Sequence, residues 1–287
     1  GNTDIVLTSN HMLNDSVLRS PDLRRKLFGD FSKEGLYPAA LNALSGNDYA
    51  VMPFAISQQM RLLNCGLVQR HCPGLLARTS ANFISHIIGN YDFKSQKFPP
   101  LATFIHFLPL TLTEEGIDIY DARTGRIDFS DGRIPGILEF NRCMVAKLQF
   151  LYDGWTELSL GRLWENFLEG RLMAVDTFSY AMPMVAGGRN FKISAQASSM
   201  RRLNSSITRI QMLGITKNCR NVEGAAEFIR FACGVEGQSI LAKSGCNIPV
   251  LRSCAESDAF LGRCPDNMRS NLKELEYGKS LLDIPIY

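Results

Sequence analysis

The clearest pattern of apolar and polar positions lies between residues 213 and 253. Residues 213–216 form a short apolar run that predicts a strand, and the polar residues 217–221 predict a turn. After this turn, apolar side chains recur at helical spacing, at Val222, Ala225, Ala226, Ile229, Ala232 and Cys233. Asn221 is a suitable N-cap for this helix, and Glu223 favours its positive N-terminus.

A second short helix is expected directly afterwards, over residues 236–243. Gly245 stands where a glycine ends a helix in the left-handed conformation. Pro249 cannot continue a helix, so residues 248–250 are expected to be extended. The stretch therefore reads as one unit, in which a strand is followed by two helices and an extended segment.

The rest of the chain alternates between strand-like and helix-like patterns. Extended segments are expected at 4–8, 49–57 (continuing toward Asn64) and 171–175. Helical stretches are expected at 14–27, with a break at Ser20-Pro21, and at 134–148 and 161–170. Residues 118–129 alternate and turn at Thr124-Gly125, which predicts a hairpin. Residues 66–103 show no readable pattern.

Length and charge exclude some classes of function. The 287 residues suggest about two domains. The 31 basic and 28 acidic residues leave a net charge of +3, and no long basic block points to nucleic acid. No apolar run approaches the roughly 20 residues that a membrane helix needs.

Motifs for covalent or metal chemistry are absent from the sequence. No two of the four histidines have metal-binding spacing, and there is no G-x-S-x-G or G-x-G-x-x-G. We therefore expect no catalytic residue, no metal and no cofactor. The eight cysteines include no Cys-x-x-Cys pair. They leave two interpretations open, disulfides of a secreted protein or small buried side chains such as Cys143 and Cys233.

Longer motifs resemble a known family. The order G-I-T-K-N, A-A-E-F-I-R-F, E-G-Q, L-A-K-S-G and I-P-V in 213–253 is similar to the C-terminal half of sugar-binding and oligosaccharide-binding proteins of ABC importers, the maltose-binding-protein-like family. The run from Tyr49 to Asn64 resembles a strand that crosses between the lobes in this family, although Leu63 and Cys65 replace its tyrosine and lysine. The run L-W-E-N-F-L-E-G-R-L-M-A over residues 163–174 is similar to the family's L-W-x-x-F-x-x-G-x-x-A-M, with its last two residues in the reverse order. The turn Phe178-Ser179-Tyr180-Ala181 that follows also resembles the family, with the family's turn glycine lost. Compared with the family, the sequence looks short at both ends.

The resemblance implies an α/β fold of two lobes, the type II periplasmic-binding-protein fold, with mixed sheets, hinge-crossing strands and a ligand cleft between the lobes. Lobe 1 would hold residues 1–55 and 213–250, and lobe 2 residues 57–212 and 251–287. The implied function is capture of a small polar solute, a mono- or oligosaccharide first, and its delivery to an ABC permease. The expected protein is a monomer, periplasmic or a cell-surface lipoprotein, and not an enzyme.

Candidate ligand contacts follow from position and from side-chain chemistry. Sugars are bound by aromatic rings that stack on their C–H faces and by polar side chains that bind their hydroxyls. One group follows the carboxyl end of the first strand, where open α/β sheets place ligands. The others lie on the crossing strand, in an aromatic segment, in the aromatic turn and at the chain end. The candidates are Ser9, Asn10, His11, Phe54, Ser57, His106, Phe107, Phe178, Tyr180 and Tyr287.

Two alternatives stay open at this point. The same fold could bind a polyamine, a metal complex or a phosphorylated solute. A two-lobed enzyme would need a nucleophile and a base, and Ser57 with His11 or His106 is the pairing that the sequence offers. No motif supports that pairing.

Overall fold

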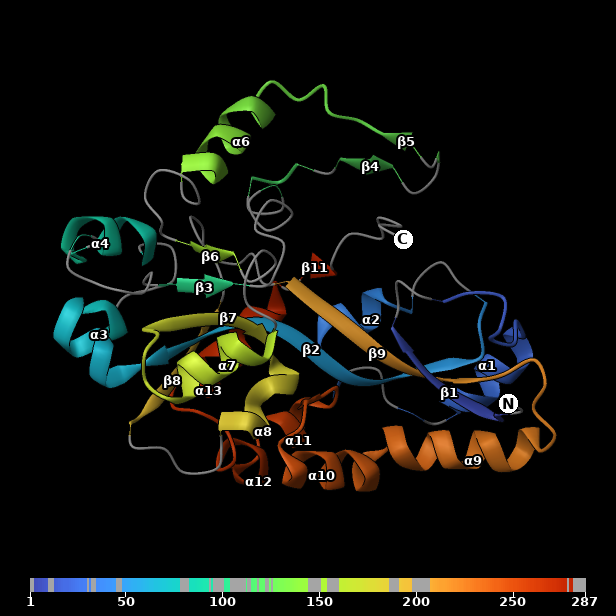
Figure 1. Ribbon diagram of the computed structural model, residues 1–287. Coiled ribbons are helices and arrows are strands. Elements are labelled where there is room, and N and C mark those ends of the chain that lie inside the picture. The colour runs from blue at the N-terminus through green and yellow to red at the C-terminus, as the bar shows by residue number, and fades with distance from the viewer. Residues whose placement is uncertain are drawn as a thin grey trace. The chain divides into compact units, whose positions relative to one another are not determined.

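The computed structural model describes most of the chain and divides it into two units (Figure 1). Unit 1 consists of Gly1–Gln58, Ile207–Cys264 and Leu275–Tyr287, and unit 2 of Gln59–Ser206 and Pro265–Glu274. The residues described are 3–9, 13–29, 31, 35–44, 48–77, 83–92, 94, 101–103, 112, 115–117, 119–121, 124, 126–143, 151–153, 160–185, 191–197, 207–277 and 279–280.

Unit 1 is built on a mixed sheet in the order β1–β9–β2–β10. Its strands are β1 (Ile5–Ser9), β9 (Ile207–Ile215), the first part of β2 (Val51–Asn64), β10 (Ile248–Pro249) and β11 (Lys279–Ser280). β9 is antiparallel to β1 and β2, whereas β11 is parallel to β9. The helices are α1 (Pro21–Phe28), α2 (Pro38–Asn42), α9 (Val222–Cys233), α10 (Val235–Ser244), α11 (Arg252–Ala255) and α12 (Asp258–Leu261). The 3₁₀ turn η7 (Glu274–Glu276) begins at the last residue of unit 2 and ends in unit 1.

Unit 2 contains a second mixed sheet, in the order β8–β2–β7–β3–β6. Its strands are the rest of β2, β3 (Leu101–Thr103), β6 (Leu151–Asp153), β7 (Ala174–Phe178) and β8 (Ile193–Ala197), with a separate hairpin of β4 (Tyr120–Asp121) and β5 (Arg126–Ile127). β2 is antiparallel to β7 and β8, whereas β3 is parallel to β7 and β6. The helices are α3 (Cys65–His71), α4 (Phe83–Asn90), α6 (Ile134–Arg142), α7 (Leu160–Leu168), α8 (Met182–Val185) and α13 (Met268–Lys273), and the 3₁₀ turns are η3 (Leu75–Ala77) and η6 (Ser179–Ala181).

The α9–α10 region follows the predicted pattern. Asn221 caps α9, because its Oδ1 accepts a hydrogen bond from Gly224 N at 2.9 Å. The helix buries the predicted stripe against β9 and α1, and α10 follows it end to end (Figure 1). Gly245 ends α10 with φ 65°, a left-handed conformation that suits glycine. One buried face and clear caps made this region predictable.

Two expected elements have other bounds. The helical stretch expected at 14–27, with a break at Ser20-Pro21, is a helix only after that break, because Ser20 caps α1 and Pro21 occupies its first turn. The strand expected at 171–175 is β7, which starts three residues later. α7 ends at Leu168, Gly170 has φ 76°, and Arg171 N donates to Asn166 O at 2.8 Å, so this turn at the end of the helix separates α7 from β7.

β2 is longer than any other described strand and is almost fully buried. Its 14 residues run without a break, 51–58 in unit 1 and 59–64 in unit 2, and all but Phe54 are buried. The strand pairs on both edges, and its burial extends to the polar residues of its second half, among them Gln58, Gln59 and Arg61. Both units are therefore α/β with mixed sheets, as expected.

The division expected from the sequence differs from the two units in four places. Residues 57–58 and 207–212 lie in unit 1 rather than with lobe 2, because β9 extends to Ile207 and pairs with β2 as far as Gln58. Leu275–Tyr287 is also part of unit 1, where β11 pairs with β9. Residues 251–264 also lie in unit 1. Leu251 bridges to Leu36, and α11 and α12 pack on α10.

Each unit has its own apolar core. Fully buried side chains in unit 1 include Leu27, Leu36, Met52, Ile56 and Phe260, and those in unit 2 include Met60, Leu62 and Phe167. Burying such a side chain completely is worth about 1.5–3 kcal/mol. Among the described helices, none is long and apolar enough to cross a membrane.

Candidate functional site

The predicted aromatic turn lies directly after the carboxyl end of β7. Phe178 ends the strand with only 4% of its surface exposed, whereas Tyr180, in η6, exposes 47%. The two rings stack, with centroids 6.0 Å apart and planes inclined by 19°. Phe178 therefore supports an exposed ring and keeps little surface of its own for a ligand. Tyr180 is therefore the exposed large aromatic side chain of this turn.

A buried ion pair lies two residues before this turn. Arg61 on β2 and Asp176 on β7 are cross-strand partners, and their side chains are 0% and 1% exposed. Arg61 Nε donates to Asp176 Oδ1 at 2.8 Å, and Arg61 Nη2 donates to Asp176 Oδ2 at 3.0 Å. This two-bond geometry is the strong form of an arginine–carboxylate contact.

Polar side chains, among them Arg209, meet at one end of the unit 1 sheet. Because β9 is antiparallel to both β1 and β2, the carboxyl ends of β1 and of the unit 1 part of β2 lie at the same edge. Ser9 pairs with Gln211, and Ser57 pairs with Arg209 on the same face. Asn247, just before β10, donates from Nδ2 to Gln211 Oε1 at 3.4 Å. Carboxyl ends of strands are where open α/β sheets bind ligands.

The remaining two candidates on β2 are less accessible than expected. Ser57 is 3% exposed, which does not suit a nucleophile that must reach a substrate. Phe54 is partly buried and is the extra residue of a bulge, where the β2–β9 register shifts between Pro53 and Ala55. Five other candidates lie outside the described residues: Asn10, His11, His106, Phe107 and Tyr287.

A buried glutamine shapes the bulge at Phe54. Gln238 Nε2 donates to Phe54 O at 2.8 Å and to Ala232 O at 3.2 Å, while Val250 N donates to Gln238 Oε1 at 2.8 Å. The β2–β10 register pairs Ile248 with Ile56 and Pro249 with Ala55, so Val250 is next in line with Phe54. The carboxamide of Gln238 therefore bridges Phe54 and Val250 directly beyond the last β2–β10 pair.

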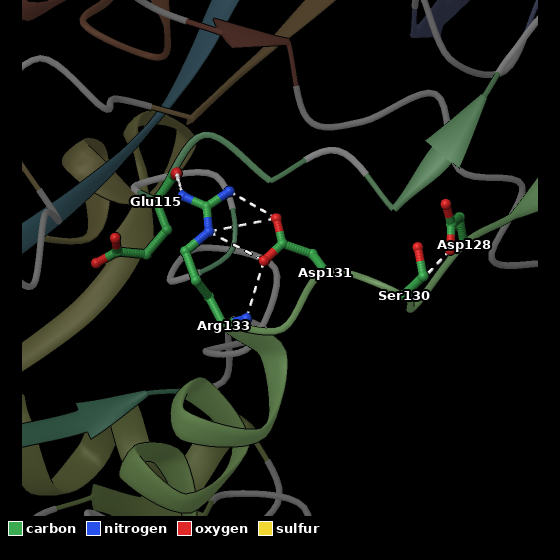
Figure 2. A network of polar contacts seen from close by, with 5 residues as sticks. All are labelled: Glu115, Asp128, Ser130, Asp131 and Arg133. Atoms are coloured by element: carbon green, nitrogen blue, oxygen red, sulfur yellow. Dashed lines mark hydrogen bonds and ion pairs between the residues drawn. The ribbon is translucent and has the colours of Figure 1, made fainter.

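A second polar cluster in unit 2 is structural. Asp131 accepts hydrogen bonds from Arg133 N at 2.9 Å, Nε at 3.0 Å and Nη2 at 2.6 Å, and Arg133 Nη1 donates to Glu115 O at 2.9 Å (Figure 2). These bonds lower the pKa of Asp131 to about 2. The cluster ties the chain at Glu115 to the start of α6, beside a small apolar core of Leu112, Ile117, Ile134 and Ile137. The Asp131 carboxylate is bonded to Arg133 of the same loop, so we assign this cluster a structural role.

Metal and disulfide chemistry find no support in the described part of the chain. Among the residues described there, no group of three or more His, Cys, Asp or Glu side chains could hold a metal ion. All eight cysteines are free thiols. Cys233 and Cys254 are buried, whereas Cys246 is exposed.

Sequence reasoning missed Arg61, Asp176, Gln211 and Asn247. A signal for the first two was present, since an arginine inside the run F-A-I-S-Q-Q-M-R-L-L-N and an aspartate inside A-V-D-T-F each need a buried partner. Gln211 and Asn247 carried no such signal, because their neighbourhood depends on pairing between strands that are distant in the sequence.

Solved structures similar to this chain are sugar- and solute-binding proteins of ABC importers. One is an ABC substrate-binding protein from Listeria monocytogenes in complex with cycloalternan, at 14% identity and a TM-score of 0.73, covering 96% of this chain and 74% of that one. Another is maltose-bound MalE3 of T. maritima, at 15% identity and a TM-score of 0.71, covering 96% and 73%. A third is UgpB from Mycobacterium tuberculosis in complex with glycerophosphocholine, at 15% identity and a TM-score of 0.69, covering 96% and 72%.

Comparison by sequence adds nothing to this result, since no family model and no curated protein matches the chain. The likeness is thus one of fold, and it extends over nearly the whole chain. It confirms at the level of the fold the resemblance that the sequence motifs indicated. The chain has the α/β fold of the two-lobed, maltose-binding-protein-like solute-binding proteins of ABC importers.

Proposed function

We propose that this chain is an extracytoplasmic solute-binding protein. It captures a small polar solute, a mono- or oligosaccharide first, and delivers it to the permease of an ABC importer. Each unit serves as one lobe, and the protein closes around the solute by hinge bending, as periplasmic binding proteins do. It acts as a monomer, and its partners are the solute and the permease.

The observation that carries this proposal is the exposed Tyr180 on its buried support. A tyrosine ring offers an apolar face for the C–H face of a sugar and a hydroxyl for hydrogen bonding. Tyr180 is held by Phe178 after the end of a strand, in a fold whose solved examples include complexes with cycloalternan and maltose. A stacking platform at the end of a strand suits a sugar better than it suits a small ion.

The polar end of the unit 1 sheet suits a hydroxyl-rich solute, and Arg209 on the same face is the side chain there that would suit a phosphate. Ser9, Gln211 and Asn247 supply hydroxyl and amide groups, which donate to and accept from sugar hydroxyls. A phosphorylated solute is the main alternative, because UgpB, which shares the fold, is in complex with glycerophosphocholine. The proposed function involves no covalent step, and buried Ser57 gives no support to a hydrolase.

A thermal-shift screen tests the proposal. The purified chain is melted with mono- and oligosaccharides, with glycerophosphocholine, and with amino acids and polyamines as controls. A ligand at 100 times its dissociation constant stabilises the folded state by about 2.7 kcal/mol, which is a clear shift in melting temperature. A shift with saccharides that is lost in Tyr180→Ala supports the proposal. A cooperative melt that no compound shifts contradicts it.

A further inference from the structure

The apolar pattern of β7, the strand that leads into the aromatic turn, does little to fix the register of its pairing with β2. All five residues of β7, A-V-D-T-F, are buried, so both faces of the strand are covered. A one-residue slip exchanges the two faces of a strand, so burial opposes the slip where one face is buried and the other is exposed to solvent. In β7 both faces are buried, and this contrast is missing. Something other than burial must select the pairing of β7 with β2.

The Arg61–Asp176 pair distinguishes the observed register from its neighbours. A slip of two residues keeps every side chain on its own face, so burial alone would tolerate it. Such a slip would place Asp176 opposite Leu63 or Gln59, and Arg61 opposite Ala174 or Phe178. Two fully buried charges would then lose their partners, which is among the costliest changes inside a protein.

The register of β7 also sets the position of Tyr180. A slip of two residues moves the end of the strand by about 6.8 Å, at about 3.4 Å per residue. That displacement exceeds the 6.0 Å between the stacked rings of Phe178 and Tyr180. The stacked rings of Phe178 and Tyr180 would then lie too far from their observed position to bind the solute.

We propose that Arg61 and Asp176 are positioning residues, a buried register lock that places the Phe178–Tyr180 platform for the solute. This inference rests on the proposed solute-binding function. Neither residue needs to touch the solute, since both are fully buried beside the turn. A buried ion pair is often replaceable by apolar side chains without loss of stability, and one attested use of buried polar groups is to specify register.

The decisive variant removes the lock but keeps the core apolar, as Arg61→Met with Asp176→Leu. It should fold cooperatively and bind the solute at least about tenfold more weakly. The reversed pair, Arg61→Asp with Asp176→Arg, should restore affinity to within about threefold of the native chain. A matched control removes an exposed ion pair of the same unit, as Asp131→Asn with Arg133→Gln (Figure 2). It should leave affinity unchanged.

A readout without solute separates this inference from the proposed function. The chain is labelled with fluorotyrosine, and the fluorine resonance of Tyr180 is assigned with Tyr180→Phe. Native, reversed-pair and control chains should each give one Tyr180 resonance at one position. The apolar pair should give a shifted resonance or more than one.

Two outcomes would overturn the register lock. One is a native-like Tyr180 resonance with native affinity in the apolar pair. The other is an apolar pair that does not fold, which would show that the ion pair sustains the fold instead of selecting the register. If no tested solute binds the native chain, the proposed function fails while the fluorine spectra still decide the lock.

Discussion

Replacing Gln238 by leucine should destabilise unit 1 strongly. The carboxamide of Gln238 is fully buried and bonds to two backbone groups of different strands, Phe54 O on β2 and Val250 N beside β10. Leucine has a similar size but can neither donate nor accept. The substitution therefore leaves both backbone groups without their bonds and creates no large cavity.

The magnitude follows from those two groups. A buried donor or acceptor that loses its partner costs about 1–3 kcal/mol. Two such groups give about 2–6 kcal/mol, and we expect a loss of about 4 kcal/mol in the free energy of unfolding. Gln238→Glu should cost at least as much, because it keeps an acceptor for Val250 N, loses the donor for Phe54 O and buries a charge.

Urea unfolding followed by circular dichroism measures this loss. Ser239→Ala, on the same helix, is the matched control, since its half-buried hydroxyl donates to Val235 O at 2.7 Å within the helix and lies 3.8 Å from the Cys254 sulfur. The control should lose about 1 kcal/mol or less. If Gln238→Leu loses no more than Ser239→Ala, the reasoning about the carboxamide is wrong.

Three further predictions concern other described residues. Asn221→Ala removes the cap of α9 and should cost about 1 kcal/mol in urea unfolding, and no loss would mean that the cap is not needed. The bonds from Arg133 lower the folded-state pKa of Asp131 to about 2, so the stability this carboxylate contributes is present above its unfolded pKa of 3.8 and disappears as the pH falls through 2. Melting of Asp131→Asn should thus fall below the native value at pH 7 and match it near pH 2, and a deficit that persists at pH 2 would contradict this origin. Exposed Cys246 should react with a thiol reagent in the native chain, whereas burial raises the pKa of Cys233 to about 12 and should protect it until unfolding. Equal reactivity of the two thiols would refute that burial.

Local sequence patterns gave reliable predictions for elements that bury one face and expose the other to solvent. The α9–α10 region was predicted to within a residue, because its apolar stripe, the Asn221 cap and Gly245 all act within a few positions. The hairpin at β4–β5 was also predicted, from alternation and a Thr-Gly turn. The motifs in these regions were enough to indicate the family resemblance that the fold comparison supports.

Prediction failed where distant segments decide the structure. The unreadable stretch 66–103 contains α3, α4 and β3, whose short apolar runs fit either a helix or a strand. The bounds of β9 and β7 depend on their pairing with β2, which no local pattern shows. For the same reason the polar neighbours of Ser9 and the partner of Arg61 emerged only from the sheet registers.

The most direct test of the account is isothermal titration calorimetry with the saccharide that gives the largest thermal shift. The native chain, Tyr180→Phe and Tyr180→Ala are titrated under the same conditions. Loss of aromatic stacking is worth about 0.5–1.5 kcal/mol beyond the area buried, so Tyr180→Ala should bind at least about tenfold more weakly. Tyr180→Phe keeps the ring and should stay much closer to the native affinity. Native affinity in Tyr180→Ala, or no heat of binding with any saccharide, would contradict the account.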